Sequence, residues 1–133
     1  MTLIVEDDAI QRWSLRELLR TRFPSMNIEE AEDGKEALEK LRTCVPDLVF
    51  MDIGLPGLNG LEVTRRIKVV HGDTVVIVFT SFDRAEYREA AFRNGASYFF
   101  TKGQTGIDEI IASVESILSE SKGGNNGKAR KVG

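Results

Sequence analysis

Short apolar runs alternate with helix-start signatures along the chain, and this alternation constrains the fold more than any other feature. Four runs are nearly continuous and too short for a helix, which is typical of parallel strands covered on both faces: 2–5, 48–51, 75–79 and 98–100. A fifth candidate strand, 26–31, is half polar and is predicted to lie at an edge, where charged side chains discourage pairing with other chains.

After each predicted strand comes a residue that can cap a helix, followed three positions later by an acid or an amide. The five pairs are Asp8 with Gln11, Asp33 with Glu36, Asn59 with Glu62, Asp83 with Glu86, and Thr105 with Asp108. A single pair of this kind is weak evidence for a helix. Five pairs in step with five strands are strong evidence, and apolar residues at helical spacing follow them.

Alternating strands and helices predict a parallel sheet with helices on both faces. The predicted fold class is therefore α/β, a doubly wound (βα)5 sheet that forms a single domain over residues 1–119. From Glu120 onward the sequence ESKGGNNGKARKVG is rich in glycine and basic residues and has almost no apolar ones. Residues 120–133 are therefore predicted to be a flexible tail or the start of a linker.

Composition argues against several functional classes. A net charge of −3 is unusual for a nucleic-acid-binding domain, and no apolar run approaches the roughly 18 residues that cross a membrane. No signal peptide opens the chain, so we expect a cytoplasmic protein that binds neither nucleic acid nor membrane through this domain. The single cysteine, Cys44, is expected to be a buried inert thiol, and the only histidine, His71, a solvated loop residue.

Polar side chains gather where the predicted strands end. Glu6 and Asp7 follow the first strand, Asp52 the third, Thr80 the fourth and Lys102 the fifth. Because ligands of an open parallel sheet bind outside the carboxyl ends of its strands, we expect these side chains to meet at one edge. Acids packed this closely repel each other and need a cation, and with only oxygen ligands on offer Mg²⁺ fits best.

A lone aspartate such as Asp52 after a buried strand is, taken by itself, most simply a turn or capping residue. A hydroxyl and a lysine that face a metal, however, complete a cage for phosphoryl oxygens. A carboxylate can also act as a nucleophile and form an aspartyl phosphate. We therefore interpret Asp52 as a residue whose charge, and whose phosphorylated form, a metal and a lysine stabilise.

The segments IVEDDAIQR, VFMDIGLPGLNGLEV, VFTS and GASYFFTK resemble, in order and spacing, the motifs of the bacterial two-component response-regulator receiver domain. The resemblance covers about residues 2 to 119 and implies the flavodoxin-like strand order 2-1-3-4-5. It implies a signalling switch of a phosphorelay that accepts a phosphoryl group from a histidine kinase or a phosphotransfer protein. Such a domain is not an enzyme beyond its own phosphorylation and dephosphorylation.

The resemblance also assigns roles at the acidic edge. Asp7 matches the direct Mg²⁺ ligand, and Glu6 matches the acid that acts mainly through water. Asp52 matches the phosphoacceptor, which is also a metal ligand, and Gly54 the position whose backbone carbonyl completes the protein ligands. Lys102 matches the phosphate-binding lysine. The proline that usually follows this lysine is replaced by Gly103, which leaves the geometry of that loop open.

The resemblance further implies a switch between Thr80 and Phe99. Thr80 matches the switch hydroxyl, which a phosphoryl group draws inward, and Phe99 the aromatic ring that turns into the vacated space. The surface of the fourth helix, fifth strand and fifth helix would then repack and dock a partner or a second copy of the chain. The alternative is that Phe99 is a core residue in both states.

Two other functions would place an aspartate at a similar position. An aspartyl-phosphate phosphatase or mutase needs a second carboxylate two residues after the nucleophile, and here that position is Gly54. A receiver-like module that never takes phosphate usually lacks an acid or the lysine, and this chain keeps both.

In the family, the positions two residues after the phosphoacceptor and two after the switch threonine tune attack by water on the phosphoryl group. Here these are Gly54 and Phe82, and neither can orient water, so slow self-dephosphorylation is predicted.

Overall fold

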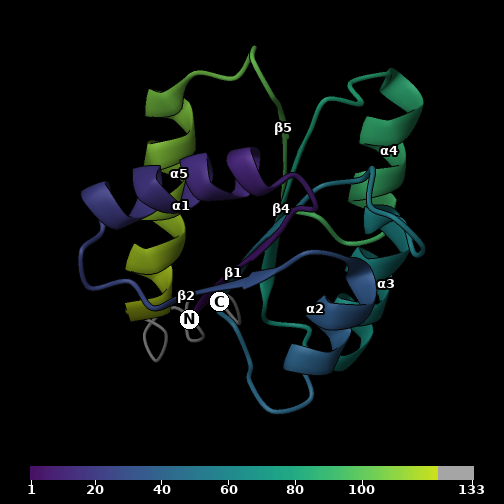
Figure 1. The fold of residues 1–133 in the computed structure, drawn as a ribbon, viewed down its shortest axis with the longest axis horizontal. Coiled ribbons are helices and arrows are strands. Elements are labelled where there is room, and N and C mark those ends of the chain that lie inside the picture. The colour runs from purple at the N-terminus through teal and green to yellow at the C-terminus, as the bar shows by residue number, and fades with distance from the viewer. Residues whose placement is uncertain (123–133) are drawn as a thin grey trace, which may run out of the picture.

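The computed structural model describes residues 1–122, in which five parallel strands form one sheet with helices on both faces (Figure 1). The strands are β1 (Thr2–Val5), β2 (Ile28–Ala31), β3 (Leu48–Met51), β4 (Val75–Thr80) and β5 (Tyr98–Thr101). The helices are α1 (Ala9–Arg22), α2 (Gly34–Lys40), α3 (Gly60–Val70), α4 (Ala85–Arg93) and α5 (Ile107–Lys122).

The strand order is β2-β1-β3-β4-β5, which confirms the predicted topology. The register pairs Val5 with Ala31 on one side and with Met51 on the other, so the ends of β1, β2 and β3 lie level. On the far side of the sheet Thr80 pairs with Thr101. The carboxyl ends of all the strands therefore form a single edge. β2 lies at the border of the sheet, as its polar residues predicted.

The strands other than β2 largely bury both of their faces, and the core therefore has two halves, whereas β2 fully buries only Ala31. Leu3, Val5, Val49 and Met51 point into the half covered by α2, α3 and α4. The alternate residues, among them Ile4, point into the half covered by α1 and α5. Figure 1 shows the same division, with α1 and α5 on the left of the sheet and the other helices on the right. This two-sided burial is why the strands read as continuous apolar runs.

Three of the five predicted caps are confirmed. The Asp8 carboxylate accepts from the backbone N–H groups of Ile10 and Gln11, and Asp33 and Asn59 cap α2 and α3 in the same way. Each of these side chains satisfies N–H groups that the first helical turn leaves without a partner. The loops that join the sheet edge to α1, α2 and α3 are therefore fixed by hydrogen bonds to their own capping side chains.

The other two predicted caps are wrong. α4 begins one residue later than expected, with Arg84 at the N-cap position and no capping bond from its side chain. The Asp83 carboxylate instead accepts from the side-chain amide of Gln104. α5 begins at Ile107, and the Thr105 hydroxyl accepts from the backbone N–H of Thr101. In both cases the polar side chain is used by the loop rather than by the helix.

Two smaller expectations also fail. Cys44 is exposed rather than buried, because it follows the turn that ends α2. His71 is partly buried at the end of α3, where its ring nitrogen Nε2 lies 3.0 Å from the carbonyl oxygen of Leu41.

α5 continues to Lys122, past the predicted domain end at 119, and residues 123–133 of the predicted tail lie outside the described residues. No helix in the described part of the chain has the length and apolar character needed to cross a membrane.

Candidate functional site

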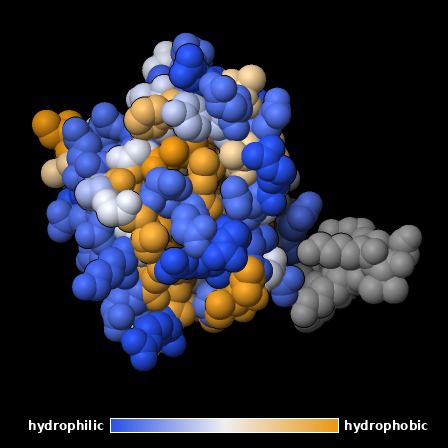
Figure 2. Space-filling model, turned by 90° about the vertical axis from the view of Figure 1, so that its right-hand side faces the viewer, coloured by the Kyte–Doolittle hydropathy of each residue, from blue (hydrophilic) through white to orange (hydrophobic). Residues whose placement is uncertain are grey.

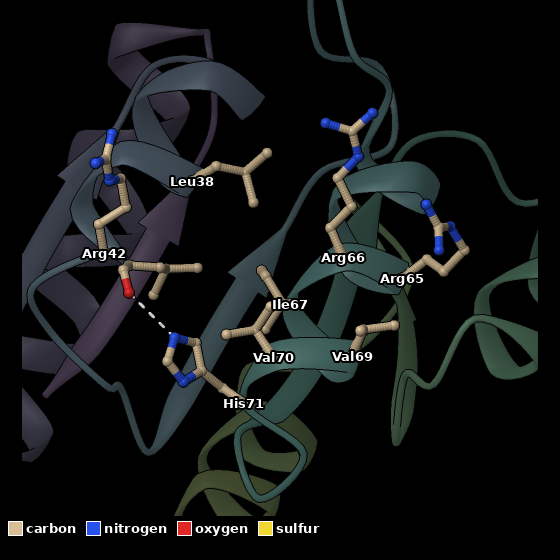
Figure 3. Close-up of a pocket in the computed structure, with 9 residues that line it drawn as sticks. Leu38, Arg42, Arg65, Arg66, Ile67, Val69, Val70 and His71 are labelled. Carbon is tan, nitrogen blue, oxygen red and sulfur yellow. Dashed lines mark hydrogen bonds between the residues drawn. The ribbon is translucent and has the colours of Figure 1, made fainter.

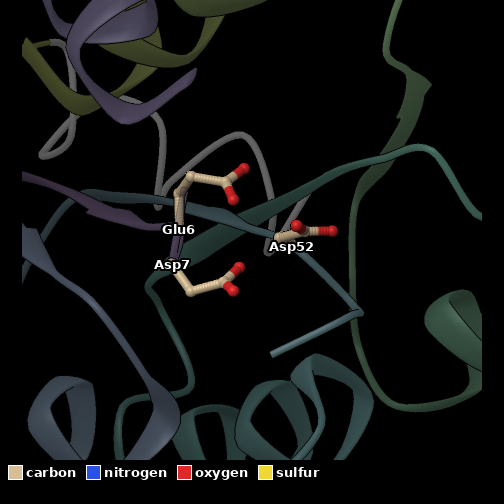
Figure 4. Close-up of side chains that lie close together, drawn as sticks. All are labelled: Glu6, Asp7 and Asp52. Carbon is tan, nitrogen blue, oxygen red and sulfur yellow. The ribbon is translucent and has the colours of Figure 1, made fainter. Parts of the chain in front are cut away.

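Three acids converge at the carboxyl edge of the sheet. Glu6 and Asp7 follow β1, Asp52 follows the neighbouring strand β3, and Figure 4 shows their side chains close together. One carboxylate oxygen from each acid lies within 4.8 Å of those of the other two. Glu6 and Asp52 are buried, at 6% and 8% exposure, whereas Asp7 is exposed. The predicted acidic cluster is therefore present, with one member open to solvent.

Lys102 joins this cluster from the other half of the sheet. It follows β5, and its ammonium nitrogen Nζ donates to Glu6 Oε1 and, at 3.1 Å, to Asp52 Oδ2. The three side chains are at most 15% exposed, so both ion pairs are largely shielded from water. A buried charge is stable only when it is paired, and this lysine pairs two acids at once.

The protonation of Glu6 reflects this crowding. Burial raises the pKa of the Glu6 carboxyl above its ordinary value, and the nearby charge of Asp52 raises it further. The hydrogen bonds from Lys102 and from the backbone N–H of Asp8 act in the opposite direction but do not cancel the effect of burial. Three carboxylates gather around a single ammonium in this pocket, an arrangement that favours the entry of another cation.

Backbone hydrogen bonds fix the loop that follows Asp52. The N–H of Gly54 donates to Asp52 Oδ1 at 3.3 Å, and the N–H of Gly60 donates to the carbonyl oxygen of Ile53. A Cβ atom at Gly60 would lie 2.0 Å from the carbonyl oxygen of Asp52, so only glycine allows α3 to start this close to the acid. Sequence reasoning missed Gly60, although its place in the loop LPGLNG was a usable signal.

The donor set matches a hard divalent cation. Carboxylate oxygens from three residues lie close enough to share one ion, no histidine or cysteine takes part, and an acid of the cluster faces solvent. Mg²⁺ prefers such oxygen ligands and keeps several waters, for which the exposed side of Asp7 leaves room. The residues at this edge therefore fit the predicted cofactor.

Comparison with known proteins decides the family. Residues 2–115 match the family described as "Response regulator receiver domain". The chain belongs to this family. Receivers bind Mg²⁺ at an acidic pocket, and in this structure Glu6, Asp7 and Asp52 form an acidic cluster. The resemblance inferred from the sequence is confirmed.

Curated relatives and solved structures support membership of this family. The receiver is 34% identical over 116 residues to a response regulator named MprA from Mycolicibacterium vanbaalenii, covering 87% of this chain and 49% of that protein. It is 35% identical to a putative transcriptional regulator from Pseudomonas aeruginosa, covering 88% and 56%. A crystal structure of a two-component response regulator of the LuxR family from Aurantimonas superposes with a TM-score of 0.81 at 30% identity, covering 99% of this chain and 97% of that one.

The receiver spans about half the length of the curated relatives that it matches. Another solved structure, the receiver domain of NtrX from Brucella abortus, covers 90% of this chain and 98% of that one with a TM-score of 0.80 and 29% identity. The match therefore covers nearly all of that receiver domain, whereas the curated relatives extend well beyond the matched region.

The predicted switch residues, Thr80 and Phe99, lie at the end of β4 and within β5. Thr80 ends β4 and is fully buried, and its backbone carbonyl accepts from the N–H of Lys102. The Thr80 hydroxyl accepts from the N–H of Phe82 at 3.2 Å. Phe99 is buried in the core half shared with α4, and the guanidinium carbon of Arg88 lies 4.7 Å from the centre of its ring. The Phe99 ring is therefore already buried in the core in this structure.

The loop after Lys102 differs from the usual receiver pattern, as the sequence indicated. No cis peptide bond occurs in the described residues, and Gly103 takes a left-handed conformation with φ near +80°. The N–H groups of Gln104 and Thr105 both donate to the carbonyl of Thr101 and close a tight turn. Glycine at this position allows the turn without strain, and Lys102 still reaches the acids.

Arg12 supports the acidic loop, and sequence reasoning missed it. Its guanidinium donates to the carbonyl oxygen of Glu6 at 2.8 Å and to the Glu30 carboxylate at 2.9 Å. The arginine therefore ties the loop after β1 to the edge strand β2. Nothing in the local sequence marks it, because an arginine in an amphipathic helix is ordinarily a solvated residue.

Proposed function

We propose that this receiver is a phosphorylation-controlled switch in which Asp52 accepts a phosphoryl group from a histidine kinase or a phosphotransfer protein. The observation that carries the proposal is the buried Asp52 carboxylate, paired with Lys102 and flanked by Glu6 and Asp7. A turn or capping role does not explain an acid that is buried among other acids and held by a distant lysine. A phosphoacceptor requires this environment.

The chemistry follows from these groups. An Asp52 oxygen attacks the phosphorus atom, a P–O bond forms, and the bond between phosphorus and the donor's nitrogen breaks as the donor leaves. The Lys102 ammonium is within hydrogen-bond reach of Asp52 and can neutralise the added phosphoryl charge. Asp7, Glu6, Asp52 and the carbonyl of Gly54 are the groups that would hold Mg²⁺, which supplies charge neutralisation when bound.

Contacts beyond the pocket support a route for the signal. Phe82, whose N–H is bonded to Thr80, packs edge-to-face on Tyr87 of α4 with 5.7 Å between ring centres. Tyr87 packs on the core half that contains Phe99, and Arg88 covers the Phe99 ring. We infer that a phosphoryl group on Asp52 draws on the Thr80 hydroxyl and that α4 and β5 respond through these contacts.

The surface formed by α4, β5 and α5 is where we expect an output partner or a second copy of the chain to dock. The kinase or phosphotransfer protein is expected to approach the pocket from the solvent side of Asp7. On this proposal the domain catalyses only its own phosphorylation and dephosphorylation. It has no role in binding nucleic acid or membrane, and its cytoplasmic location stays a prediction.

Intact mass spectrometry tests the proposal. After incubation with Mg²⁺ and acetyl phosphate, the protein should gain the mass of a single phosphoryl group, and Asp52→Asn should gain none. Asp8→Asn is the matched control, because Asp8 lies next to the pocket but caps α1, and asparagine caps equally well. An adduct that persists in Asp52→Asn, or no adduct on the unaltered protein, would contradict the proposal and favour a module that never takes phosphate.

A further inference from the structure

A groove lies between α2 and α3, away from the acidic pocket. It has a volume of about 590 Å³ and is lined by Leu38, Leu41, Arg42, Arg65, Arg66, Ile67, Val69, Val70 and His71. α3 starts beside Asp52 and runs for 11 residues, roughly 15 Å, before it reaches His71 just ahead of β4. The groove therefore opens toward the opposite edge of the sheet and takes no part in the proposed phosphoryl chemistry.

The groove has an apolar interior. Leu38 on α2 points toward Ile67 and Val70 on α3 across the gap, and the bond from His71 to the Leu41 carbonyl closes one end (Figure 3). Val70 and its neighbour Val69 remain 72% and 73% exposed. Figure 2 shows the face over α3 and α4, where hydrophobic residues form a band bordered by hydrophilic ones. Exposed apolar surface of this kind, gathered in a hollow, is typical of a site that binds another molecule.

The rim of the groove is positively charged. Of the described residues that line it, three are arginines and none is acidic. Arg65 and Arg66 share the single carboxylate of Glu62, and Arg42 lies 3.7 Å from that of Glu39. Three guanidinium groups therefore face two carboxylates. These ion pairs are solvated, so they cost little to rearrange when another acid approaches. This cationic rim stands out on a chain whose net charge is −3.

The positive charge of the rim favours a negatively charged binding partner. Residues 121–133 contain four basic residues and no acid, so the chain's own end carries the wrong charge for this groove. We propose that the groove between α2 and α3 docks an acidic segment of a partner protein, which inserts an apolar side chain between Leu38 and Val70 and places carboxylates on Arg42 and Arg66. An apolar anchor within a charged rim is the usual arrangement of a docking site.

Binding of a synthetic peptide, followed by amide chemical shifts of the folded protein, tests this proposal. The probe is a short peptide with leucine and phenylalanine at helical spacing and aspartate or glutamate at the other positions. We expect saturable shifts at residues 38–42 and 65–71 and none at the acidic pocket. Arg42→Gln combined with Arg66→Gln should weaken binding about tenfold, as the loss of two solvated charge pairs implies. Arg93→Gln on α4 is the matched control and should leave the affinity unchanged.

Val70→Asp gives a second test at a position too exposed to endanger folding. It places a carboxylate in the groove and should abolish binding of the acidic peptide. Equal affinity for the same peptide with asparagine and glutamine in place of its acids would overturn the proposal, as would shifts that lie outside the groove. So would a dimer, formed without peptide and lost in Val70→Asp, because it would assign the groove to a second copy of the chain. Phosphoryl uptake by Asp52 is unaffected in every case.

Discussion

At the scale of single residues, Lys102 has the most demanding position, because it is the partner of two buried acids. Lys102→Met should leave Glu6 and Asp52 without a countercharge and lower the free energy of unfolding by about 3 kcal/mol. Added Mg²⁺ should restore part of this loss, since the metal replaces the missing positive charge. Urea unfolding with and without Mg²⁺ measures both effects.

The same variant should take up little or no phosphoryl group, because the charge that stabilises the phosphorylated form is lost. Lys35→Met, which removes an exposed lysine from α2, is the matched control for a lost ammonium. If Lys102→Met were as stable as the unaltered protein in the absence of Mg²⁺, the two ion pairs would not hold the acids as described.

Phe82 and Gly54 together explain why slow loss of phosphate is expected. A Cβ atom at Gly54 would lie 2.4 Å from Cε2 of the Phe82 ring, so the ring lies directly against the loop that follows Asp52. An apolar ring excludes water there and cannot orient it for attack on the phosphoryl group. We predict a phosphate lifetime of minutes or longer, and Phe82→Gln should shorten it.

Gly54→Asn should shorten the lifetime as well, but only with a shift of the Phe82 ring, because the added side chain and the ring compete for the same space. The decay of the phosphorylated mass peak in the absence of any phosphatase measures both lifetimes. Rapid decay of the unaltered protein would show that Phe82 does not protect the phosphoryl group.

At the scale of elements, α4 begins without a side-chain cap. Its N-cap residue, Arg84, makes no side-chain capping bond, whereas α1, α2 and α3 are capped by their own side chains. Arg84→Asp should therefore stabilise the protein by about 1 kcal/mol, because a carboxylate there can accept from N–H groups of the first turn. A thermal melt measures the gain.

Asp33→Ala provides the opposite control, since it removes an existing cap from α2 and should cost about the same amount. No stabilisation by Arg84→Asp would mean that the N–H groups of α4 are already satisfied. A weakly capped helix between Phe82 and the Phe99 ring is also suited to move, so a better cap should reduce the response of α4 to phosphorylation.

At the scale of the whole molecule, metal binding and folding are coupled. The acids that would hold Mg²⁺ come from the ends of β1 and β3, which are far apart in an unfolded chain. Mg²⁺ should therefore bind only the folded state and raise the melting temperature by mass action. Asp7→Asn should remove most of this gain while it leaves the buried Glu6 and Asp52 pairs with Lys102 in place. A melting temperature that ignores millimolar Mg²⁺ would contradict the metal site.

Much of the fold could be predicted because its signals are local. Continuous apolar strands, a polar edge strand and side-chain caps such as Asp8 and Asn59 each reflect burial or hydrogen bonding within a few residues. The caps at Asp83 and Thr105 were wrong because other hydrogen bonds claim those side chains, a tertiary one to Gln104 for Asp83 and a loop bond to the N–H of Thr101 for Thr105. Local pattern cannot reveal that competition.

The candidate site also combines features that the sequence predicts with features that depend on tertiary packing. The acids and Lys102 could be placed at one edge because parallel strands end together. Arg12 and the contact of Phe82 with Gly54 could not be assigned, since each depends on the distance between two elements rather than on residue type. The groove between α2 and α3 is likewise a product of packing, and its arginines look in the sequence like ordinary solvated helix residues.

Amide and side-chain chemical shifts recorded with beryllofluoride and Mg²⁺ test whether a phosphoryl group on Asp52 changes the environment of α4 and β5. We predict shifts in the acidic pocket and also across residues 83–105, including Tyr87, Arg88 and Phe99, with none in Asp52→Asn. Thr80→Ala should keep the pocket shifts and lose those at Phe99. Shifts confined to the pocket, or a Phe99 response that survives Thr80→Ala, would show that phosphorylation of Asp52 is not coupled through Thr80 to α4 and β5.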